Sequence, residues 1–163
     1  RIPVVETIAG RANMLATHPL NIGPIGVTGS NSANTIGEEA DVILAVGTRL
    51  QDFTTGSWTA FAKDARIIGM NAARHDAAKH MSLTVVGDAK LGLTALGSAL
   101  KGYSAPDSWV GHARAERKKW ADYVAENTRI GNGPASYAQA IGAVNALCDP
   151  RDRIVAAAGG QGC

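Results

Sequence analysis

Two short glycine-containing segments hold the residue types that could bind an anion. Gly26 and Gly29 stand before a predicted helix, where backbone N–H groups can point at a phosphate. In the second segment, Gly47 and Thr48 precede Arg49, whose guanidinium donors suit a pair of phosphate oxygens. These five residues are the candidate nucleotide cradle of the chain.

The same segments also have a purely structural interpretation. Glycine lets a loop turn tightly, and Arg49 could pair with the carboxylate of Asp41 or Asp52 instead of a ligand. Neither segment matches the Walker pattern or Gly-x-Gly-x-x-Gly. By spacing alone, the structural interpretation is the stronger one.

Other residue types give no catalytic set. His75 and His80 are five residues apart, whereas two metal ligands on one face of a helix stand four apart, and no third ligand follows. The chain has no Gly-x-Ser-x-Gly elbow, and its spacing suggests no Cys–His pair. The sequence therefore predicts no catalytic residue and no metal ligand.

The candidate loops follow apolar segments that predict a parallel sheet. Residues 41–47 contain an uninterrupted apolar run, typical of a strand that is buried on both faces. Similar segments cover 2–7, 65–70 and 83–87, each followed by a polar or glycine-containing loop. Because right-handed crossovers place such loops on one sheet edge, they would form one binding face. The predicted fold class is α/β, a Rossmann-like, mostly parallel sheet flanked by helices.

The segments between these strands predict loops and helices. Residues 11–20 are expected to be irregular or briefly helical, and 21–34 to form a loop. Ser30 or Ser32 could cap a helix over 33–40.

Two further helices are expected in the first part of the chain. One covers 55–63 and buries Trp58 and Phe61. The other covers 88–100, begins at Asp88 and turns its leucines inward (Leu91, Leu93, Leu96 and Leu100).

The composition pattern divides the chain into three parts. Residues 1–102 form a central Rossmann-like domain, incomplete at its amino terminus. Residues 103–134 form a helical interdomain linker, with a charged helix over 107–127 and a turn-rich break after it. Residues 135–163 begin another domain, with a helix over 136–148 and a strand over 153–158. One such helix–strand unit cannot bury its own faces, so we expect it to dock or to associate.

Composition limits the classes of function. Of 163 residues, 45% are apolar and 18% are charged, as in globular proteins. The net charge of +2 without a basic stripe argues against nucleic acid, and the absence of a long apolar run argues against a membrane span. Two cysteines without a disulfide framework suit the cytoplasm. The chain begins inside a predicted strand, which indicates a piece of a longer polypeptide.

A family resemblance is carried by DVILAVGTRLQDFTTGSWTAF and by ARIIGMNAARHDAAKH. The sequence resembles the central domain of thiamine-diphosphate-dependent enzymes of the acetolactate synthase and pyruvate oxidase type. Within that family, it is most similar to the inositol-catabolic branch that hydrolyses a trihydroxycyclohexane-dione. The sequence segments that resemble this branch are GVTGSNSAN, GTRLQDFTTGSW and SYAQAIGAVN with the later VAAAGG.

The resemblance implies a three-domain enzyme of which this chain covers the middle. The glutamate that activates the cofactor lies in the first domain, and the Gly-Asp-Gly…Asn motif for magnesium and diphosphate lies deeper in the third. Thiamine diphosphate and Mg²⁺ are therefore expected in the full-length enzyme, while this chain should bind neither tightly and should be inactive. Gly159, Gly160 and Gln161 would lie on the diphosphate side of the cofactor.

Flavin-containing relatives use the central domain to bind FAD. The resemblance assigns Gly26, Gly29 and the segment 47–49 to that nucleotide, together with an Asp-x-Asp segment after the next strand. Here that segment reads Asn71-Ala72-Ala73-Arg74. The loss of both carboxylates argues against bound FAD.

The implied reaction opens a cyclic dione by cleaving a C–C bond with water, using the cofactor as electron sink. The implied partners are the other domains of the same polypeptide, a small-molecule substrate and further copies in a homodimer or homotetramer. Two alternatives stay open. One is an acetolactate-synthase-like carboligase acting on pyruvate, and the other is a non-catalytic nucleotide-binding or structural domain.

Overall fold

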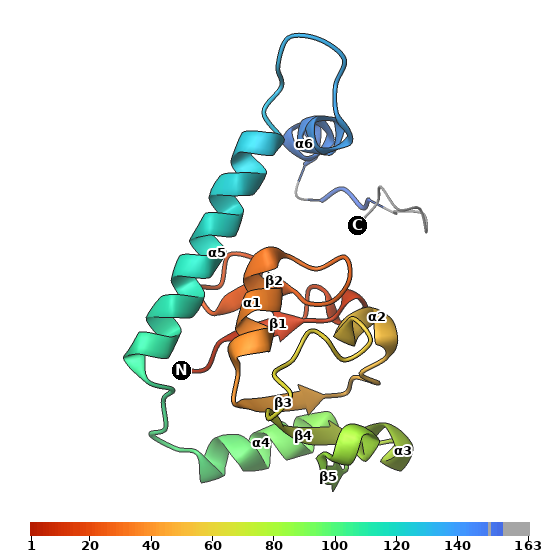
Figure 1. Cartoon of the computed structure of the whole chain (residues 1–163), viewed down its shortest axis with the longest axis vertical. Coiled ribbons are helices and arrows are strands. Elements are labelled where there is room, and N and C mark those ends of the chain that lie inside the picture. Colours follow the sequence, from red (N-terminus) through yellow and green to blue (C-terminus); the bar gives the residue numbers. More distant parts are fainter. Residues whose placement is uncertain (150, 155–163) are drawn as a thin grey trace. The chain divides into compact units, whose positions relative to one another are not determined.

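The computed structural model describes residues 1–149 and 151–154, which form two compact units, Arg1–Arg117 and a second that begins at Lys118. The strands and helices alternate in the first unit (Figure 1). The strands are β1 (Val4–Glu6), β2 (Asn21–Pro24), β3 (Val42–Val46), β4 (Arg66–Asn71) and β5 (Leu83–Val86). The longer helices are α1 (Asn31–Glu39), α4 (Ala89–Ala99), α5 (Asp107–Asn127) and α6 (Tyr137–Leu147). Single turns form α2 (Asp52–Thr55) and α3 (Arg74–Ala77).

All described strand pairs are parallel, which confirms the predicted α/β class. β1 pairs with β2, with Val5 opposite Gly23, and β4 lies between β3 and β5, with Ile43 opposite Ile67. The expectation of one sheet is not met, because β1 and β3 do not pair and the strands form a two-stranded and a three-stranded sheet. The four predicted strands of this region are all present.

The fifth strand, β2, corrects the prediction of a loop over 21–34. Its four residues include Gly23 and Pro24, two residue types that are depleted in strands, so the sequence gave no strand signal. Tertiary contacts form the strand instead. Asn21 and Ile22 are buried, and the Ile25 N–H donates to the Glu6 carbonyl oxygen.

Ser30 caps α1, which confirms one of the two predicted alternatives. Its hydroxyl oxygen accepts a hydrogen bond from the Ala33 N–H at 3.2 Å. Ser32 lies inside the first turn, where its hydroxyl donates to the Ile22 carbonyl oxygen at 2.8 Å. The helix therefore begins two residues before the predicted start and is tied to β2.

The predicted helix over 55–63 is wrong. Only α2 is helical here, and it ends at Gly56, which adopts the left-handed conformation. Ser57 and Trp58 continue with positive φ values of 54° and 70°, so the segment cannot resume a helix. Phe61 is nevertheless buried, as predicted, and Trp58 packs at the edge of the same core.

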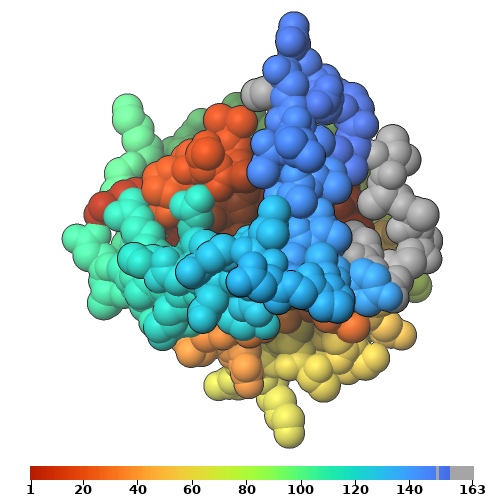
Figure 2. Space-filling view, turned by 90° about the horizontal axis from the view of Figure 1, so that it is seen from above, coloured from red at the N-terminus to blue at the C-terminus, as the bar shows by residue number. Residues whose placement is uncertain are grey.

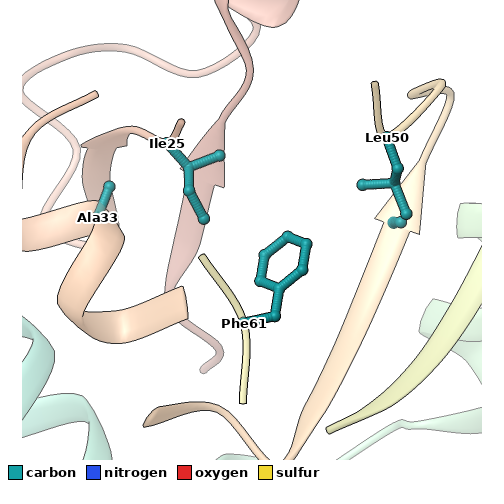
Figure 3. Close-up of a cluster of buried hydrophobic side chains, with 5 residues drawn as sticks. Ile25, Ala33, Leu50 and Phe61 are labelled. Atoms are coloured by element: carbon teal, nitrogen blue, oxygen red, sulfur yellow. The ribbon is translucent and has the colours of Figure 1, made fainter. Parts of the chain in front are cut away.

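One hydrophobic cluster lies between the two sheets. Figure 3 shows the Phe61 side chain between Ile25, which follows β2, and Leu50, which follows β3. Partly buried Val5 from β1 and Ile43 from β3 pack against the same cluster. The two sheets therefore share one core although they do not pair. A smaller cluster packs α5 against α1 and β2 through Ile22, Ile36 and Ala113.

Helix α4 begins where it was predicted but does not turn its leucines inward. Asp88 caps it by accepting from the Leu91 N–H at 2.9 Å. Leu91 is 72% exposed and Leu93 is 46% exposed, although the helix contacts β4. Its Gly92 lies against the Met70 side chain of β4.

The second unit contains α6, which matches the predicted helix over 136–148. Ser136 and Gln139 form a capping box at its start. Figure 2 shows the surface of α6 and of the loop before it, in blue. The predicted apolar face is exposed, with Tyr137 and Leu147 the most accessible of its members. The predicted strand over 153–158 falls mostly outside the described residues.

The predicted domain boundaries at residues 102 and 134 remain a prediction. None of the helices among the described residues combines the length and the apolar character needed to cross a membrane.

A buried carboxylate fastens the irregular segment 11–20 between β1 and β2. Glu6 is 8% exposed, and its Oε1 accepts from the Met14 N–H at 3.0 Å. Its Oε2 accepts from the Asn21 side-chain amide at 3.2 Å, and that amide also donates to the carbonyl oxygens of Met14 and Leu15. Both oxygens of Glu6 therefore act as acceptors.

We predict that Glu6→Gln lowers the free energy of unfolding by about 1–3 kcal/mol, because the new amide N–H₂ must face one of these donors. Urea denaturation measures the change. The control is Glu38→Gln on the exposed surface of α1, which should stay within about 0.5 kcal/mol. Equal midpoints for the two variants would contradict the assigned role of Glu6.

Candidate functional site

The glycine-rich turn between β2 and α1 is held by reciprocal hydrogen bonds. The Gly26 N–H donates to Asn34 Oδ1 at 2.9 Å, and Asn34 Nδ2 donates back to the Gly26 carbonyl oxygen at 3.0 Å. The Val27 N–H donates to the Phe53 carbonyl oxygen at 2.9 Å. The turn is therefore joined both to α1 and to α2.

Gly29 closes the same turn. Its N–H donates to the Gly26 carbonyl oxygen at 2.9 Å, and a Cβ at this position would overlap the backbone of Pro24 and Ile25. The N–H groups of Gly26 and Gly29 are thus engaged within the protein, which supports their structural interpretation. The neighbouring Thr28 Oγ1 is buried and has no hydrogen-bond partner among the described residues. The nucleotide cradle itself stays a prediction.

The second candidate segment leaves β3 and is joined to the end of β4. The Gly47 N–H donates to the Met70 carbonyl oxygen at 2.8 Å, and Gly47 has a φ of 63°. The Thr48 hydroxyl accepts from the Leu50 N–H, and the Thr48 carbonyl oxygen accepts from Asn71 Nδ2 at 3.1 Å. The turn after β3 therefore has few free polar groups.

Arg49 is placed differently from either structural pairing considered for it. Its side chain is exposed, and within residues 1–149 and 151–154 its guanidinium makes no ion pair with Asp41 or Asp52. Its carbonyl oxygen accepts from Lys79 Nζ at 2.9 Å. The guanidinium therefore stands at the end of β3 without a carboxylate bound to it.

The loop after β4 brings further charges to this position. Lys79 Nζ lies 2.8 Å from Asp76 Oδ1, and both side chains are largely buried. The hydrogen bond from Lys79 holds the pKa of Asp76 below its ordinary value against the opposing effect of desolvation, and the nearby charges of His75 and Arg49 add to it. The structure thus gathers cationic groups around one carboxylate.

Sequence reasoning missed the residues that join these loops. Asn71 and Lys79 bond to backbone atoms 23 and 30 residues away. A polar residue directly after the predicted strand over 65–70 was the available signal for Asn71. For Lys79, no sequence signal exists, because its partner is a carbonyl group that every residue carries.

The structure brings three segments together at the carboxyl ends of their strands: the turn after β2, the loop after β3 and the end of β4. The turn at Gly26 contacts Phe53, which follows the loop 47–51, and that loop contacts Asn71. Gly159, Gly160 and Gln161 lie outside the described residues. Across the described ranges, no three His, Cys, Asp or Glu side chains converge as metal ligands would.

An open hollow of about 260 Å³ lies elsewhere, at the amino end of β4. Trp58 and Phe61 line it together with Lys63 and His80, so its lining is both apolar and polar. Because Ala65 and Ile67 line it, it does not coincide with the edge where the candidate residues meet.

Comparison with known proteins assigns this domain. Residues 1–96 match the family model for the central domain of thiamine pyrophosphate enzymes. The chain belongs to this family. The match covers more than half of the chain and includes all five strands, so it agrees with the predicted resemblance.

Several relatives carry one name, 3D-(3,5/4)-trihydroxycyclohexane-1,2-dione hydrolase. The protein of this name from Geobacillus thermodenitrificans is 48% identical over 102 residues, which is 63% of this chain and 16% of the relative. One from Listeria monocytogenes is 39% identical over 131 residues, or 80% of this chain and 20% of the relative. A protein from Bacillus cereus with the same name followed by the number 2 is 39% identical over 121 residues, 74% of this chain and 19% of the relative. The chain thus spans a fifth or less of the length of these curated relatives.

We predict that Gly26→Ala destabilises the domain by about 2–4 kcal/mol. Gly26 has a φ of 120°, and an added Cβ would overlap the Phe53 carbonyl oxygen. The matched control is Gly111→Ala in α5, where an added Cβ meets open space. This substitution should raise the free energy of unfolding by about 0.5–1 kcal/mol, because alanine favours a helix more than glycine does. Thermal unfolding of both variants measures the two changes. If Gly26→Ala left the stability unchanged, the turn would not be constrained as described.

We predict that Lys79→Met raises the pKa of Asp76 toward its ordinary value of 3.8. The pKa of Asp76 is lower in the folded protein than in the unfolded one. The ionised carboxylate therefore stabilises the fold at pH values above its ordinary pKa, and this contribution is lost as the pH falls through the lowered pKa. NMR titration of the Asp76 carboxyl measures the shift. Lys63→Met, which removes a lysine that makes no described contact with Asp76, should leave the pKa unchanged.

Proposed function

We propose that the full-length protein is a thiamine-diphosphate-dependent hydrolase that opens a trihydroxycyclohexane-dione ring by C–C bond cleavage. The observation that carries this proposal is the identity of 34–48% to relatives of that name, over 58–80% of this chain. The family match supports the cofactor class. The substrate is taken from the name of those relatives.

This proposal assigns the cofactor and its metal no ligand among the described residues. Mg²⁺ needs several oxygen ligands in near-octahedral geometry, and no such group of acidic side chains converges in residues 1–149 and 151–154. The hollow beside Trp58 and Phe61 lies at the amino end of β4, away from the carboxyl ends of the strands. No step of the reaction is therefore assigned to these residues. In this proposal, Gly159, Gly160 and Gln161 approach the diphosphate from the following domain.

The role proposed for the central domain is to hold its neighbours at fixed positions. Its strand-end loops are cross-linked by Asn34 with Gly26, by Asn71 with Thr48 and by Lys79 with Arg49. Such side-chain to backbone bonds fix the loops without any ligand. A rigid edge suits a domain whose partners supply the catalytic groups.

FAD is not part of this proposal. Asn71 stands where flavin-binding relatives are expected to carry a carboxylate, and its amide is already used. Its Nδ2 donates to the Thr48 carbonyl oxygen, and its Oδ1 accepts from the Ala73 N–H at 3.0 Å. The exposed Arg49 and the buried Thr28 hydroxyl are what would support the alternative of a bound nucleotide.

The proposed partners are the remaining domains of the same polypeptide, the dione substrate and further copies in a homodimer or homotetramer. A cytoplasmic location also belongs to the proposal, since Cys148 is a free thiol and two cysteines form no disulfide framework.

We predict that the full-length protein, supplied with thiamine diphosphate and Mg²⁺, converts the dione to an open-chain acid and forms no acetolactate from pyruvate. Chromatography of both reaction mixtures measures the products. Acetolactate formation without dione hydrolysis would favour the carboligase alternative.

Calorimetry provides the matched comparison. The 163-residue chain should show no micromolar binding of thiamine diphosphate, whereas the full-length protein should bind it and lose it when Mg²⁺ is chelated. Micromolar binding by the short chain would mean that a complete site lies within it.

A further inference from the structure

The hollow at the amino end of β4 takes its lining from two different connections of the chain. Trp58 and Phe61 belong to the segment that joins β3 to β4, and His80 belongs to the segment that joins β4 to β5. The other lining residues lie close to the start of β4 (Ala62, Lys63, Ala65 and Ile67). The hollow therefore depends on the fold, not on the conformation of a single loop.

Two aromatic rings line the hollow next to each other. The Trp58 and Phe61 rings contact edge to face, with their centroids 5.9 Å apart and an angle of 61° between their planes. Phe61 belongs to the buried core, and Trp58 packs at its edge. Aromatic side chains in such a position offer a large apolar area to another planar ring.

His80 borders the same hollow without adding a positive charge at neutral pH. Its ring lies against the Trp58 ring, with an angle of 32° between the two planes. Desolvation lowers the pKa of His80, and the charge of Lys79 adds to this effect, while the charge of Asp52 opposes it. Because the pKa falls below the ordinary value for histidine, the imidazole is mostly neutral at pH 7.

Lys63 is the cation among the lining residues. It is exposed, and in residues 1–149 and 151–154 its ammonium group makes no ion pair or hydrogen bond. Lys79, in contrast, is engaged by the Asp76 carboxylate and by the Arg49 carbonyl oxygen. The Lys63 ammonium is therefore available to the carboxylate of a ligand, to which it can donate charge-assisted hydrogen bonds.

The backbone of both bordering segments adopts a conformation that is uncommon for residues other than glycine. Ser57 and Trp58 have φ values of 54° and 70°, and His80 and Met81 have φ values of 58° and 56°. Backbone of this kind is concentrated at ligand-binding sites, where the surrounding structure holds it. In the described ranges, four of the six non-glycine residues with positive φ lie in these two segments, which distinguishes this hollow from the rest of the surface.

The volume of the hollow limits the size of a ligand. Pockets for cofactors and drug-sized molecules typically have volumes of about 300–1,000 Å³. The hollow has about 260 Å³. It therefore suits a compound with a single ring better than a nucleotide or a longer cofactor.

We propose that this hollow binds a small aromatic carboxylate, with the ring beside Trp58 and Phe61 and the carboxylate on Lys63. The apolar lining selects a ring, and the single unpaired cation selects an acid. Since the hollow lies at the opposite end of β4 from the candidate nucleotide cradle, its ligand is not the molecule on which the cofactor acts. The site does not depend on which reaction the full-length protein catalyses.

Ligand-observed fluorine NMR with the full-length protein tests the proposal. The probe is 4-fluorobenzoate, and 4-fluorobenzamide is the matched neutral probe with the same ring. The acid should bind with a Kd on the order of 1 mM, as suits so small a molecule, and the amide should bind about fivefold more weakly. Absence of 4-fluorobenzoate binding at about 10 mM would overturn the proposal.

Lys63→Met tests the contact with the carboxylate. Methionine keeps an unbranched apolar side chain but removes the charge, so 4-fluorobenzoate should bind about fivefold more weakly while the amide is unaffected. The matched control is Lys90→Met, which removes an exposed lysine of α4 that does not line the hollow. Equal affinities of the two variants for the acid would contradict the role of Lys63.

Trp58→Leu tests the aromatic side of the hollow. It removes the ring that both probes share, so the acid and the amide should each bind about two- to tenfold more weakly. Since Trp58 packs at the edge of the core, urea denaturation of this variant checks that it is folded. A folded variant with unchanged affinity for both probes would refute the placement of the ring.

Competition separates this site from the catalytic one. The affinity for 4-fluorobenzoate should be the same with and without thiamine diphosphate and Mg²⁺. Displacement of the probe by the cofactor would place it in the catalytic site and overturn the proposal. A full-length protein that hydrolyses no dione should still bind the probe, so the failure of one proposal is distinguishable from the failure of the other.

Discussion

The packing of Phe61 between the two sheets is the interaction on which the rest of the first unit depends. The ring is carried by an irregular segment, yet it contacts residues that follow β2 and β3, and α1 packs beside it through Ala33. Because β1 and β3 share no hydrogen bonds, side-chain packing joins the sheets in the described chain. That packing positions the two sheets, and it therefore also positions the candidate loops, because each loop begins where a strand ends.

Much of this fold could be predicted from the sequence, for identifiable reasons. Strands such as β3 and β4 are continuous apolar runs, and this pattern has few other interpretations. Asp88 and, as one of two alternatives, Ser30 were predicted at helix starts because a capping side chain is a local signal. These features depend on residues within a few positions of each other.

The features that could not be predicted depend on distant contacts. β2 contains Gly23 and Pro24 and exists because β1 pairs with it. The segment after Gly56 has a helical composition, but a left-handed C-cap ends the helix there. At the candidate site, the sequence supplied Arg49 but not its surroundings, because Asn71 and Lys79 bond to main-chain atoms far along the chain. The inward face expected for α4 was also wrong, since Leu91 and Leu93 are exposed.

The reciprocal pair between Asn34 and Gly26 has a chemical consequence for the ageing of the protein. The amide of Asn34 imitates a peptide group, donating through Nδ2 and accepting through Oδ1 in the same contact. Deamidation of Asn34 would replace the donor by a second carboxylate oxygen and set it against the carbonyl oxygen of Gly26. The turn that links β2, α1 and α2 would then lose one bond and gain a repulsion, so a single hydrolytic event at this amide would loosen three elements at once.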